Sequence, residues 1–471
     1  MHLRRDYINR SLSLCLLTST LTGCAGNPAL PLFNGYFSDG VTTVESRDSS
    51  GNFFPVDQPT PAISADGQFV AFEVRPSSGN DIYIRDRATG ITELVSVTSD
   101  GTPFESLSWA PTLSGDGRLV AFESFGETLG PSDEINNLNI FVHDRQTGAT
   151  VRVTDSADVD GFSRSAALSQ DGRFVAFLSR ASDLVPGDTN GRYDVFLHDL
   201  QTQATTRVNV SSAGQQDSGG ANDRNAPGIS ADGRFIAFES DGDNLVPDDT
   251  NGEEDVFVHD RVTLATVRVS VSSTGEQGTP GMGGSRSPVI SADGRLVAFI
   301  GWDKNLAPGN EYSEASSSVV YVHDRDADGN GVFDETCAGC RRTERVPLEA
   351  PDLPDNGSVS DLAMSGDGHT VAYVRTLTNP ATTSPAAPSA WDATVWIYDR
   401  ANGTTRRVTA DLPGMRFEGD SLGFVPITRQ VANNSERPRL SHDGRFVTYG
   451  GQFWAAYSAS REAVFVEDLR P

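Results

Sequence analysis

The chain has 471 residues, of which 37% are hydrophobic, and its formal net charge at pH 7 is −27. This length is ample for one large core or several small ones. The charge argues against a nucleic-acid partner, because duplex binding needs clustered lysines and arginines, and here 64 acidic residues face 37 basic ones. A low hydrophobic fraction with 46 glycines favours short strands joined by many turns.

Residues 1–23 have the pattern of a targeting segment. Two arginines precede a short apolar run, Leu12–Leu21, which is too short to span a bilayer as a stable helix. The run ends in Leu-Thr-Gly-Cys, with the cysteine at Cys24, and this string resembles the lipobox of bacterial lipoproteins. The resemblance implies a signal peptide cleaved before Cys24, lipidation of its sulfur and, because Ala25 follows instead of aspartate, an outer-membrane lipoprotein facing the periplasm or cell surface. An uncleaved or secreted product is the alternative, and residues 24–37 are expected to be a linker.

One phrase, Ser-x-Asp-Gly followed by an apolar run, recurs seven times at a spacing of 50 to 76 residues. Asp-Gly supplies the positive-φ positions that tight hairpins require. A supersecondary unit repeated at this period predicts an array of β units. The seven Asp-Gly pairs begin at Asp66, Asp116, Asp171, Asp232, Asp293, Asp367 and Asp443.

Each repeat predicts four antiparallel strands. A short apolar segment precedes the turn, a buried strand such as 295–300 follows it, a third strand such as 255–260 comes next, and an outer strand such as 149–153 ends the unit. Radial repetition of such units predicts an all-β, seven-bladed β-propeller over residues 38–471. The seventh repeat lacks its outer strand, and residues 39–46 have that strand's pattern, so we expect this N-terminal strand to complete the last blade and close the ring.

The repeat consists of S-x-D-G-x-x-[VI]-A-[FY] followed by [VI]-[FY]-V-x-D-x-x-[TN]-G, over nearly all of residues 38–471. It resembles the TolB-type, WD-repeat-like β-propeller repeats common in bacterial exported proteins. The resemblance implies the fold but no single function, because this scaffold hosts interaction proteins and unrelated enzymes. TolB itself carries an α/β domain before its propeller, for which this chain has no room, so a Tol-specific role is not implied.

The acidic loop from residue 324 to 335 is the best candidate for chemistry. Its acidic residues stand at positions 1, 3, 5 and 12 with glycine at position 6, the spacing that wraps oxygens around Ca²⁺. We therefore expect one structural calcium ion here, and an acidic, turn-rich hairpin is the alternative. The candidate ligands are Asp324, Asp326, Asp328, Asn330 (through its carbonyl) and Glu335. Weaker copies, which Asx-rich turns explain adequately, are Asp188, Asn190 and Asp194, and Asp249, Asn251 and Asp255.

Histidine-aspartate pairs recur at one position of the repeat, at His143, His198, His259 and His323. An active site occurs once, whereas structural roles repeat, so these histidines are expected to brace neighbouring strands. The Gly-Asp-Ser-Leu-Gly string at residues 419–423 matches a nucleophile motif, but it lies in a loop and not between a strand and a helix. No catalytic residue is therefore expected.

Cys337 and Cys340 form a C-x-x-C pair, which in an oxidising compartment predicts a disulfide that pins a loop. A redox role would need a helix N-terminus, and a zinc site would need two further ligands, for which the sequence has no second cysteine pair.

Strand alternation places the tight turns at one end of every blade and most long connections at the other. Four arginines fall at the long-loop end just before inner strands and are candidates for a partner-binding face, with pairing to local acids as the alternative: Arg164, Arg224, Arg286 and Arg437.

These patterns predict a monomeric, lipid-anchored propeller that acts as a binding scaffold for a protein or glycan of the cell envelope, with calcium as its cofactor and no enzyme activity. The alternatives are a propeller-type polysaccharide lyase or hydrolase, which needs convergent carboxylates or histidines at the channel mouth, and a purely structural envelope protein.

Overall fold

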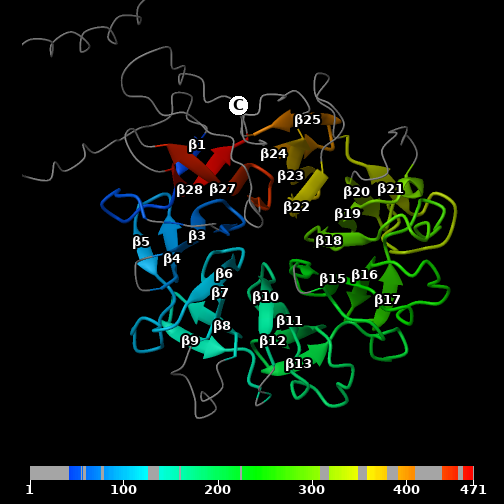
Figure 1. Cartoon of the computed structure of the whole chain (residues 1–471), viewed down its shortest axis with the longest axis horizontal. Helices are drawn as coiled ribbons and strands as arrows, with labels where there is room; N and C mark the ends of the chain where they lie inside the picture. The colour runs from blue at the N-terminus through cyan, green and yellow to red at the C-terminus, as the bar shows by residue number, and fades with distance from the viewer. Residues whose placement is uncertain are drawn as a thin grey trace, which may run out of the picture. The chain divides into compact units, whose positions relative to one another are not determined.

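A computed structural model shows seven four-stranded antiparallel sheets, which confirms the predicted all-β, seven-bladed propeller. Figure 1 shows the sheets arranged in chain order around a common axis. Among the described residues one short 3-10 helix, η1 (Lys304–Leu306), interrupts the strands, and no helix there is long and apolar enough to cross a membrane. The structure describes residues 42–469 except 55, 57–59, 76–78, 126–136, 157, 159–160, 223–224, 308–317, 348–357, 379–390, 409–437 and 455–459.

The strands of blades 1 to 6 run from the axis outward in chain order, and blade 7 has the N-terminal strand as its outermost strand. Blades 1 to 3 are β2 (Ala62–Ile63), β3 (Phe69–Val74), β4 (Asp81–Asp86) and β5 (Thr92–Leu94); β6 (Ser108–Leu113), β7 (Leu119–Ser124), β8 (Asn139–Asp144) and β9 (Ala149–Arg152); and β10 (Ser163–Leu168), β11 (Phe174–Ser179), β12 (Asp194–Asp199) and β13 (Ala204–Arg207). Blades 4 and 5 are β14 (Gly228–Ile229), β15 (Phe235–Ser240), β16 (Asp255–Asp260) and β17 (Ala265–Arg268); and β18 (Ser285–Ile290), β19 (Leu296–Gly301), β20 (Val319–Asp324) and β21 (Arg342–Arg345). Blade 6 is β22 (Ser358–Met364), β23 (Thr370–Thr378), β24 (Trp391–Asp399) and β25 (Thr404–Arg407), and blade 7 is β26 (Arg439–Leu440), β27 (Phe446–Trp454), β28 (Ser460–Asp468) and β1 (Thr42–Val44).

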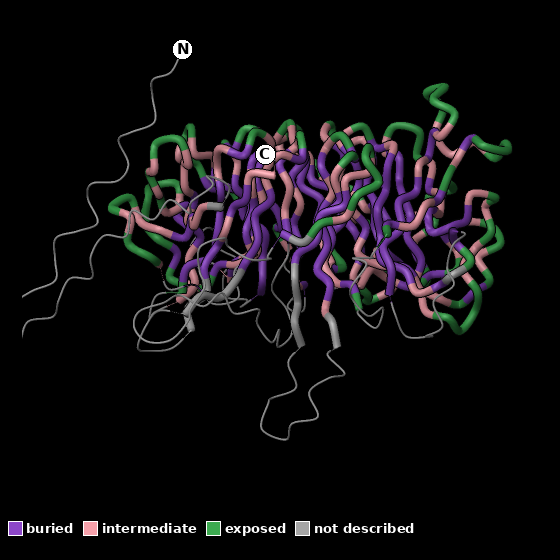
Figure 2. Tube along the Cα trace, turned by 90° about the horizontal axis from the view of Figure 1, so that it is seen from above, coloured by how far each residue is buried: buried purple, intermediate pink, exposed green. Residues whose placement is uncertain are grey.

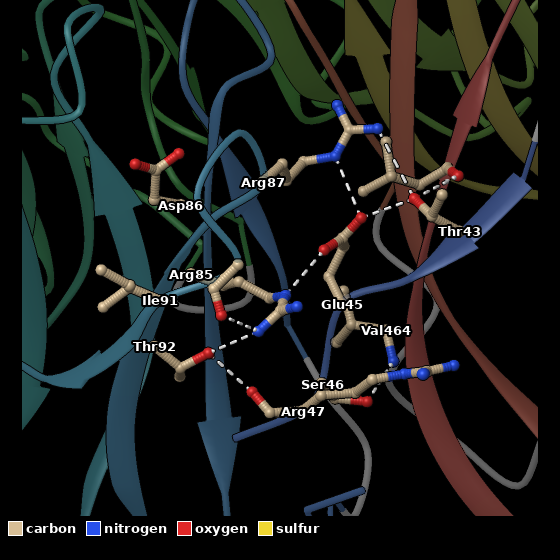
Figure 3. Close-up of polar contacts among 12 residues, drawn as sticks. Thr43, Glu45, Ser46, Arg47, Arg85, Asp86, Arg87, Ile91, Thr92 and Val464 are labelled. Atoms are coloured by element: carbon tan, nitrogen blue, oxygen red, sulfur yellow. Dashed lines mark hydrogen bonds and ion pairs between the residues drawn. The ribbon is translucent and has the colours of Figure 1, made fainter. Parts of the chain in front are cut away.

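The N-terminal strand closes the ring, as the truncated seventh repeat predicts. β1 pairs antiparallel with β28, with Val44 opposite Phe465. The Glu45 N–H then donates to the Val464 carbonyl at 2.8 Å. Figure 3 shows that the Glu45 carboxylate also reaches Arg85 and Arg87 of blade 1, so the closing segment joins the last blade to the first.

Apolar residues of the second and third strands form the core between blades. Figure 2 views the blades edge-on, with buried residues along the strands and exposed ones gathered at the turns. One aromatic position of the second strand is buried in all seven blades, and its members are Phe72, Phe122, Phe177, Phe238, Phe299, Tyr373 and Tyr449. Broad aromatic and β-branched side chains suit sheets that pack face to face.

The Asp-Gly turns form a belt around the axis at one end of the propeller. In each turn, a backbone hydrogen bond runs from the residue between the serine and the aspartate to the equivalent residue of the next blade. The donor is either that residue's own N–H or the N–H of the aspartate that follows it. The last bond, from the His442 N–H to the Ala65 carbonyl, closes the circle. Five of these seven residues are alanine or glycine, because the seven lie close together around the axis. A Cβ added to Gly366, for example, would lie 1.9 Å from His442 Nδ1. The large exceptions, Gln170 of blade 3 and His442 of blade 7, contact each other at 3.0 Å across the axis.

Candidate functional site

The inner strands of all seven blades enclose a cavity of about 240 Å³ on the propeller axis. Its wall is made mainly of small, aliphatic and hydroxyl-bearing side chains, with one carboxylate from blade 6, Asp361, and one guanidinium from blade 7. One representative per blade is Thr60, Thr112, Ala167, Gly228, Val289, Ala363 and Arg439. The belt of Asp-Gly turns lies at the other end of these strands, so the cavity belongs to the end where the long connections enter.

A bulge in the inner strand shapes the mouth of this cavity. The pairing register of β6, β10, β18 and β22 shifts at a non-glycine residue with positive φ, and left-handed backbone at such residues is costly unless its surroundings hold it. In three places a glutamate of the preceding blade accepts the N–H of that residue. These pairs are Glu73 with Ala110 at 2.8 Å, Glu123 with Ser165 at 2.7 Å and Glu239 with Ser287 at 2.7 Å.

Glu239 of blade 4 is the member of this set whose environment the structure describes most fully. Its side chain is buried, with 3% of the residue exposed, and it also accepts a hydrogen bond from Asn225 Nδ2 at 3.1 Å. Burial, together with the charge of Glu254, raises the pKa of Glu239 to about 8. Asn225 and Ser287 line the cavity, so the Glu239 carboxyl stands directly behind its wall.

The arginines predicted for a partner face are in part visible. Arg286 stacks on Trp302, with its guanidinium carbon 4.4 Å from the ring centroid, and Arg164 lies 5.7 Å from the Tyr193 ring centroid. Arg224 and Arg437 lie outside the described residues. Sequence reasoning missed Arg439, which lines the cavity from β26. It could have been found from the repeat, because the other blades have small or aliphatic residues at this inner-strand position.

The acidic loop brings only part of the predicted calcium set together. Asp324 forms an ion pair with Arg295 at 2.7 Å, the contact that Asp144, Asp199, Asp260 and Asp468 make with their own arginines in other blades. The Asp326 carboxylate accepts the backbone N–H groups of Asn330 and Gly331. Asp328 and Glu335 converge, since both accept hydrogen bonds from Asn330 Nδ2, at 3.1 and 2.6 Å. Calcium stays a prediction, with Asp328 and Glu335 as the carboxylates that the loop aims at one point.

The two weaker loops place an arginine between their carboxylates. Arg207 lies 3.5 Å from Asp188 and 3.3 Å from Asp194, and Asn190 donates to Asp194 at 3.0 Å. The other loop repeats this arrangement, with Arg268 2.8 Å from Asp249 and 3.1 Å from Asp255, and with Asn251 bonded to Asp255 at 2.9 Å. A guanidinium therefore supplies the compensating positive charge in both loops.

The recurrent histidines contact the outer strands. The Nδ1 atom lies 2.9 Å from a threonine hydroxyl at His143, His198 and His259, and 2.8 Å at His323. Burial lowers the pKa of His323 to about 3, so this imidazole is neutral at physiological pH. Cys337 and Cys340 are joined by a disulfide, and the string at 419–423 lies outside the described residues.

Comparisons with known proteins identify the fold and no family. No family model matches the chain, and no curated protein matches it. An oligogalacturonate lyase from Vibrio parahaemolyticus has a similar structure, with 12% identity, coverage of 92% of this chain and 95% of that one, and a TM-score of 0.51. The propeller domain of the trilobed protease from Pyrococcus furiosus is 13% identical, with 88% and 96% covered and a TM-score of 0.48. TolB from Acinetobacter baumannii is 16% identical, with 90% and 88% covered and a TM-score of 0.37.

The comparison with the lyase corrects one expectation. The prediction that the chain is not an enzyme is contradicted, because an oligogalacturonate lyase has this fold over nearly the whole chain. The propeller therefore does not argue against catalysis. At 12% identity the likeness shows the fold alone, and what the lyase acts on is a property of that protein.

Proposed function

We propose that the chain is a TolB-like, envelope-anchored propeller that binds a protein or glycan at the mouth of its axial cavity. The observation that carries the proposal is the cavity itself, to which every blade contributes its inner strand. Long connections surround that end of the propeller, and loops held by a rigid scaffold are the usual place for binding residues.

The size and lining of the cavity indicate how a partner would bind. A volume of about 240 Å³ admits one sugar residue or one side chain, so the partner lies across the mouth and inserts a single group. Hydroxyl, amide, carboxylate and guanidinium groups in the wall, with Arg286 and Arg164 at nearby inner-strand positions, favour a polar group that can form hydrogen bonds.

Blocking the cavity tests this proposal. Thr112→Trp fills the cavity from β6, and Val151→Trp adds the same bulk at a 43% exposed position of the outer strand β9. A glycan array, followed by calorimetry on any hit, tests the glycan arm. A photo-crosslinker at Ser287, applied in membranes, tests the protein arm. Binding or crosslinking that is lost in Thr112→Trp and kept in Val151→Trp supports the proposal, and a partner held equally by both variants refutes it.

Anchoring and calcium belong to the same proposal. The lipobox-like string supports attachment through Cys24, and Cys24→Ser should move the protein from the membrane pellet to the soluble fraction. The convergence of Asp328 and Glu335 supports a structural calcium ion in the blade 5 loop.

A further inference from the structure

Two carboxylates and two cysteine sulfurs meet in the loop that joins β20 to β21. The four residues are Asp328, Glu335, Cys337 and Cys340, and one potential ligand atom from each lies within 4.8 Å of all the others. Cys340 is buried, and its Sγ contacts Asp328 Oδ2 at 3.4 Å. The sequence offered no second cysteine pair for a metal, but the fold supplies two oxygen ligands in its place.

Backbone hydrogen bonds hold this group together independently of the disulfide. The Ala327 N–H donates to the Cys340 carbonyl at 2.7 Å, which keeps Cys340 beside Asp328. The Cys340 N–H donates to the Cys337 carbonyl at 3.2 Å, which closes the C-x-x-C turn. These bonds keep the two cysteines near Asp328 when the S–S bond is broken, and Asn330 Nδ2, which donates to both Asp328 and Glu335, links the second carboxylate to the first.

The donor set favours one kind of metal. Two thiolates with two carboxylates suit a tetrahedral, borderline-soft ion such as Zn²⁺, whereas Ca²⁺ takes six or more oxygens. Ligand atoms at zinc distances lie about 3.3–3.8 Å apart in a tetrahedron. The separations within the cluster, which reach at most 4.8 Å, therefore need to shorten by about 1 Å or less, whereas the two sulfurs need to move apart once their bond is broken.

We propose that reduction of the Cys337–Cys340 disulfide converts this loop into a zinc site with two thiolate and two carboxylate ligands. A dithiol reductant supplies both electrons: its thiolate attacks Cys337, which is exposed, the S–S bond breaks and Cys340 leaves as a thiolate. The second thiol of the reductant then displaces Cys337 and forms the reductant's own disulfide. Zn²⁺ binds both sulfurs, and the two thiol protons pass to solvent.

The test compares the full chain in its oxidised and reduced states in calcium-free buffer. A phosphine reductant is used because it does not compete for zinc, and Co²⁺ serves as a visible substitute. We expect one zinc ion per reduced chain and none per oxidised chain, with a thiolate-to-cobalt charge-transfer band and the intense visible bands of tetrahedral cobalt. Binding in both states, in neither state, or without the thiolate band overturns the proposal.

Variants separate the two ligand types. Cys340→Ser should abolish zinc binding. Loss of a residue that only hydrogen-bonds to a metal ligand weakens metal binding by roughly 10–100-fold, so Asp328→Asn and Glu335→Gln, which remove ligands, should each weaken it by at least as much. Glu105→Gln, at an exposed carboxylate of blade 2, is the matched control and should bind as the wild type does. Thermal melts of all variants in the oxidised state show whether each one folds. If both carboxylate variants bind zinc as tightly as the control, the carboxylates are not ligands and the site is wrong.

Discussion

The ion pairs at the ring closure give a prediction that the structure makes quantitative. Glu45 stands where the outer strands of the other blades have a buried valine, such as Val95, whose N–H makes the equivalent bond to its third strand. Arg85 occupies the position at which four other blades have a histidine that contacts a threonine of the outer strand. Arg85 makes the same kind of contact, because it donates a hydrogen bond to Thr92 Oγ1 at 2.9 Å. The Glu45 carboxylate is 6% exposed and lies 3.2 Å from Arg85 and 3.0 Å from Arg87 (Figure 3).

Replacing Glu45 by valine leaves two mostly buried arginines without their carboxylate. Breaking a buried pair in this way costs about 3–5 kcal/mol. Arg85 and Arg87 keep backbone carbonyl acceptors, at Gly90 and Gly67, so we expect a loss of about 2–3 kcal/mol. The unfolding entropy of residues 42–469 is about 0.9 kcal/mol/K, which converts that loss into a fall in Tm of about 2–3 °C.

Hydrogen exchange followed by mass spectrometry is the sharper assay. If β1 opens locally, the same energy speeds exchange of its amides by about 30- to 150-fold, while amides of β15 are unaffected. Glu45→Val combined with Arg85→His rebuilds the valine-histidine pattern of the other blades and should recover most of the loss. Glu93→Gln, which removes a 45% exposed partner of Arg145, is the control and should cost less than about 1 kcal/mol. Unchanged exchange in Glu45→Val would refute the view that these ion pairs hold the ring closed.

Three further predictions follow from the axis and the acidic loop. Burial makes the folded protein bind the Glu239 proton more tightly than the unfolded chain does, so the free energy of unfolding should fall as pH rises from about 5 through 8. In thermal melts across this pH range, Glu239→Gln should show a smaller fall. A wild-type slope equal to that of the variant would contradict the raised pKa. Gly366→Ala should cost about 1–3 kcal/mol by overpacking against His442, and adding His442→Ala should restore the Tm; no rescue would mean that the crowding lies elsewhere. At about 10 mM calcium, a site with an affinity typical of extracellular modules should raise the free energy of unfolding of the oxidised chain by about 1.4–2.7 kcal/mol. Asp328→Asn should remove this shift, and a wild-type melt indifferent to calcium would count against the site.

The fold could be predicted because its signals are local and repeated. Each Asp-Gly turn dictates a hairpin through its own backbone, and apolar runs on both sides supply buried strands. The closing strand could also be predicted, because the seventh repeat has no outer strand to pair with β28 and residues 39–46 have the sequence pattern of an outer strand. The role of Glu45 could not be read in the same way, because its partners lie on blade 1 and pair with it only when the ring is closed.

The calcium loop shows how two patterns can compete for one residue. Asp324 is the first acid of the loop and also the last residue of the third strand, where the repeat pairs an aspartate with an arginine. Arg295 pairs with that carboxylate, so the repeat pattern and the calcium spacing assign different partners to Asp324. The raised pKa of Glu239 was equally hidden, because it depends on the burial of this carboxyl and on the charge of Glu254, and both arise only when the chain folds.

Departures from the repeat, more than the repeat itself, locate what is specific to this chain. A position filled alike in every blade answers a need that every blade has, such as a hairpin or a brace between strands. The ion pair of Glu45 with Arg85 occurs only where the ring closes, and the large pair Gln170 and His442 only where opposite blades meet. By the same logic the cysteine-carboxylate loop of blade 5, which has no counterpart among the described blades, is the place where substitutions should change function before they change the fold.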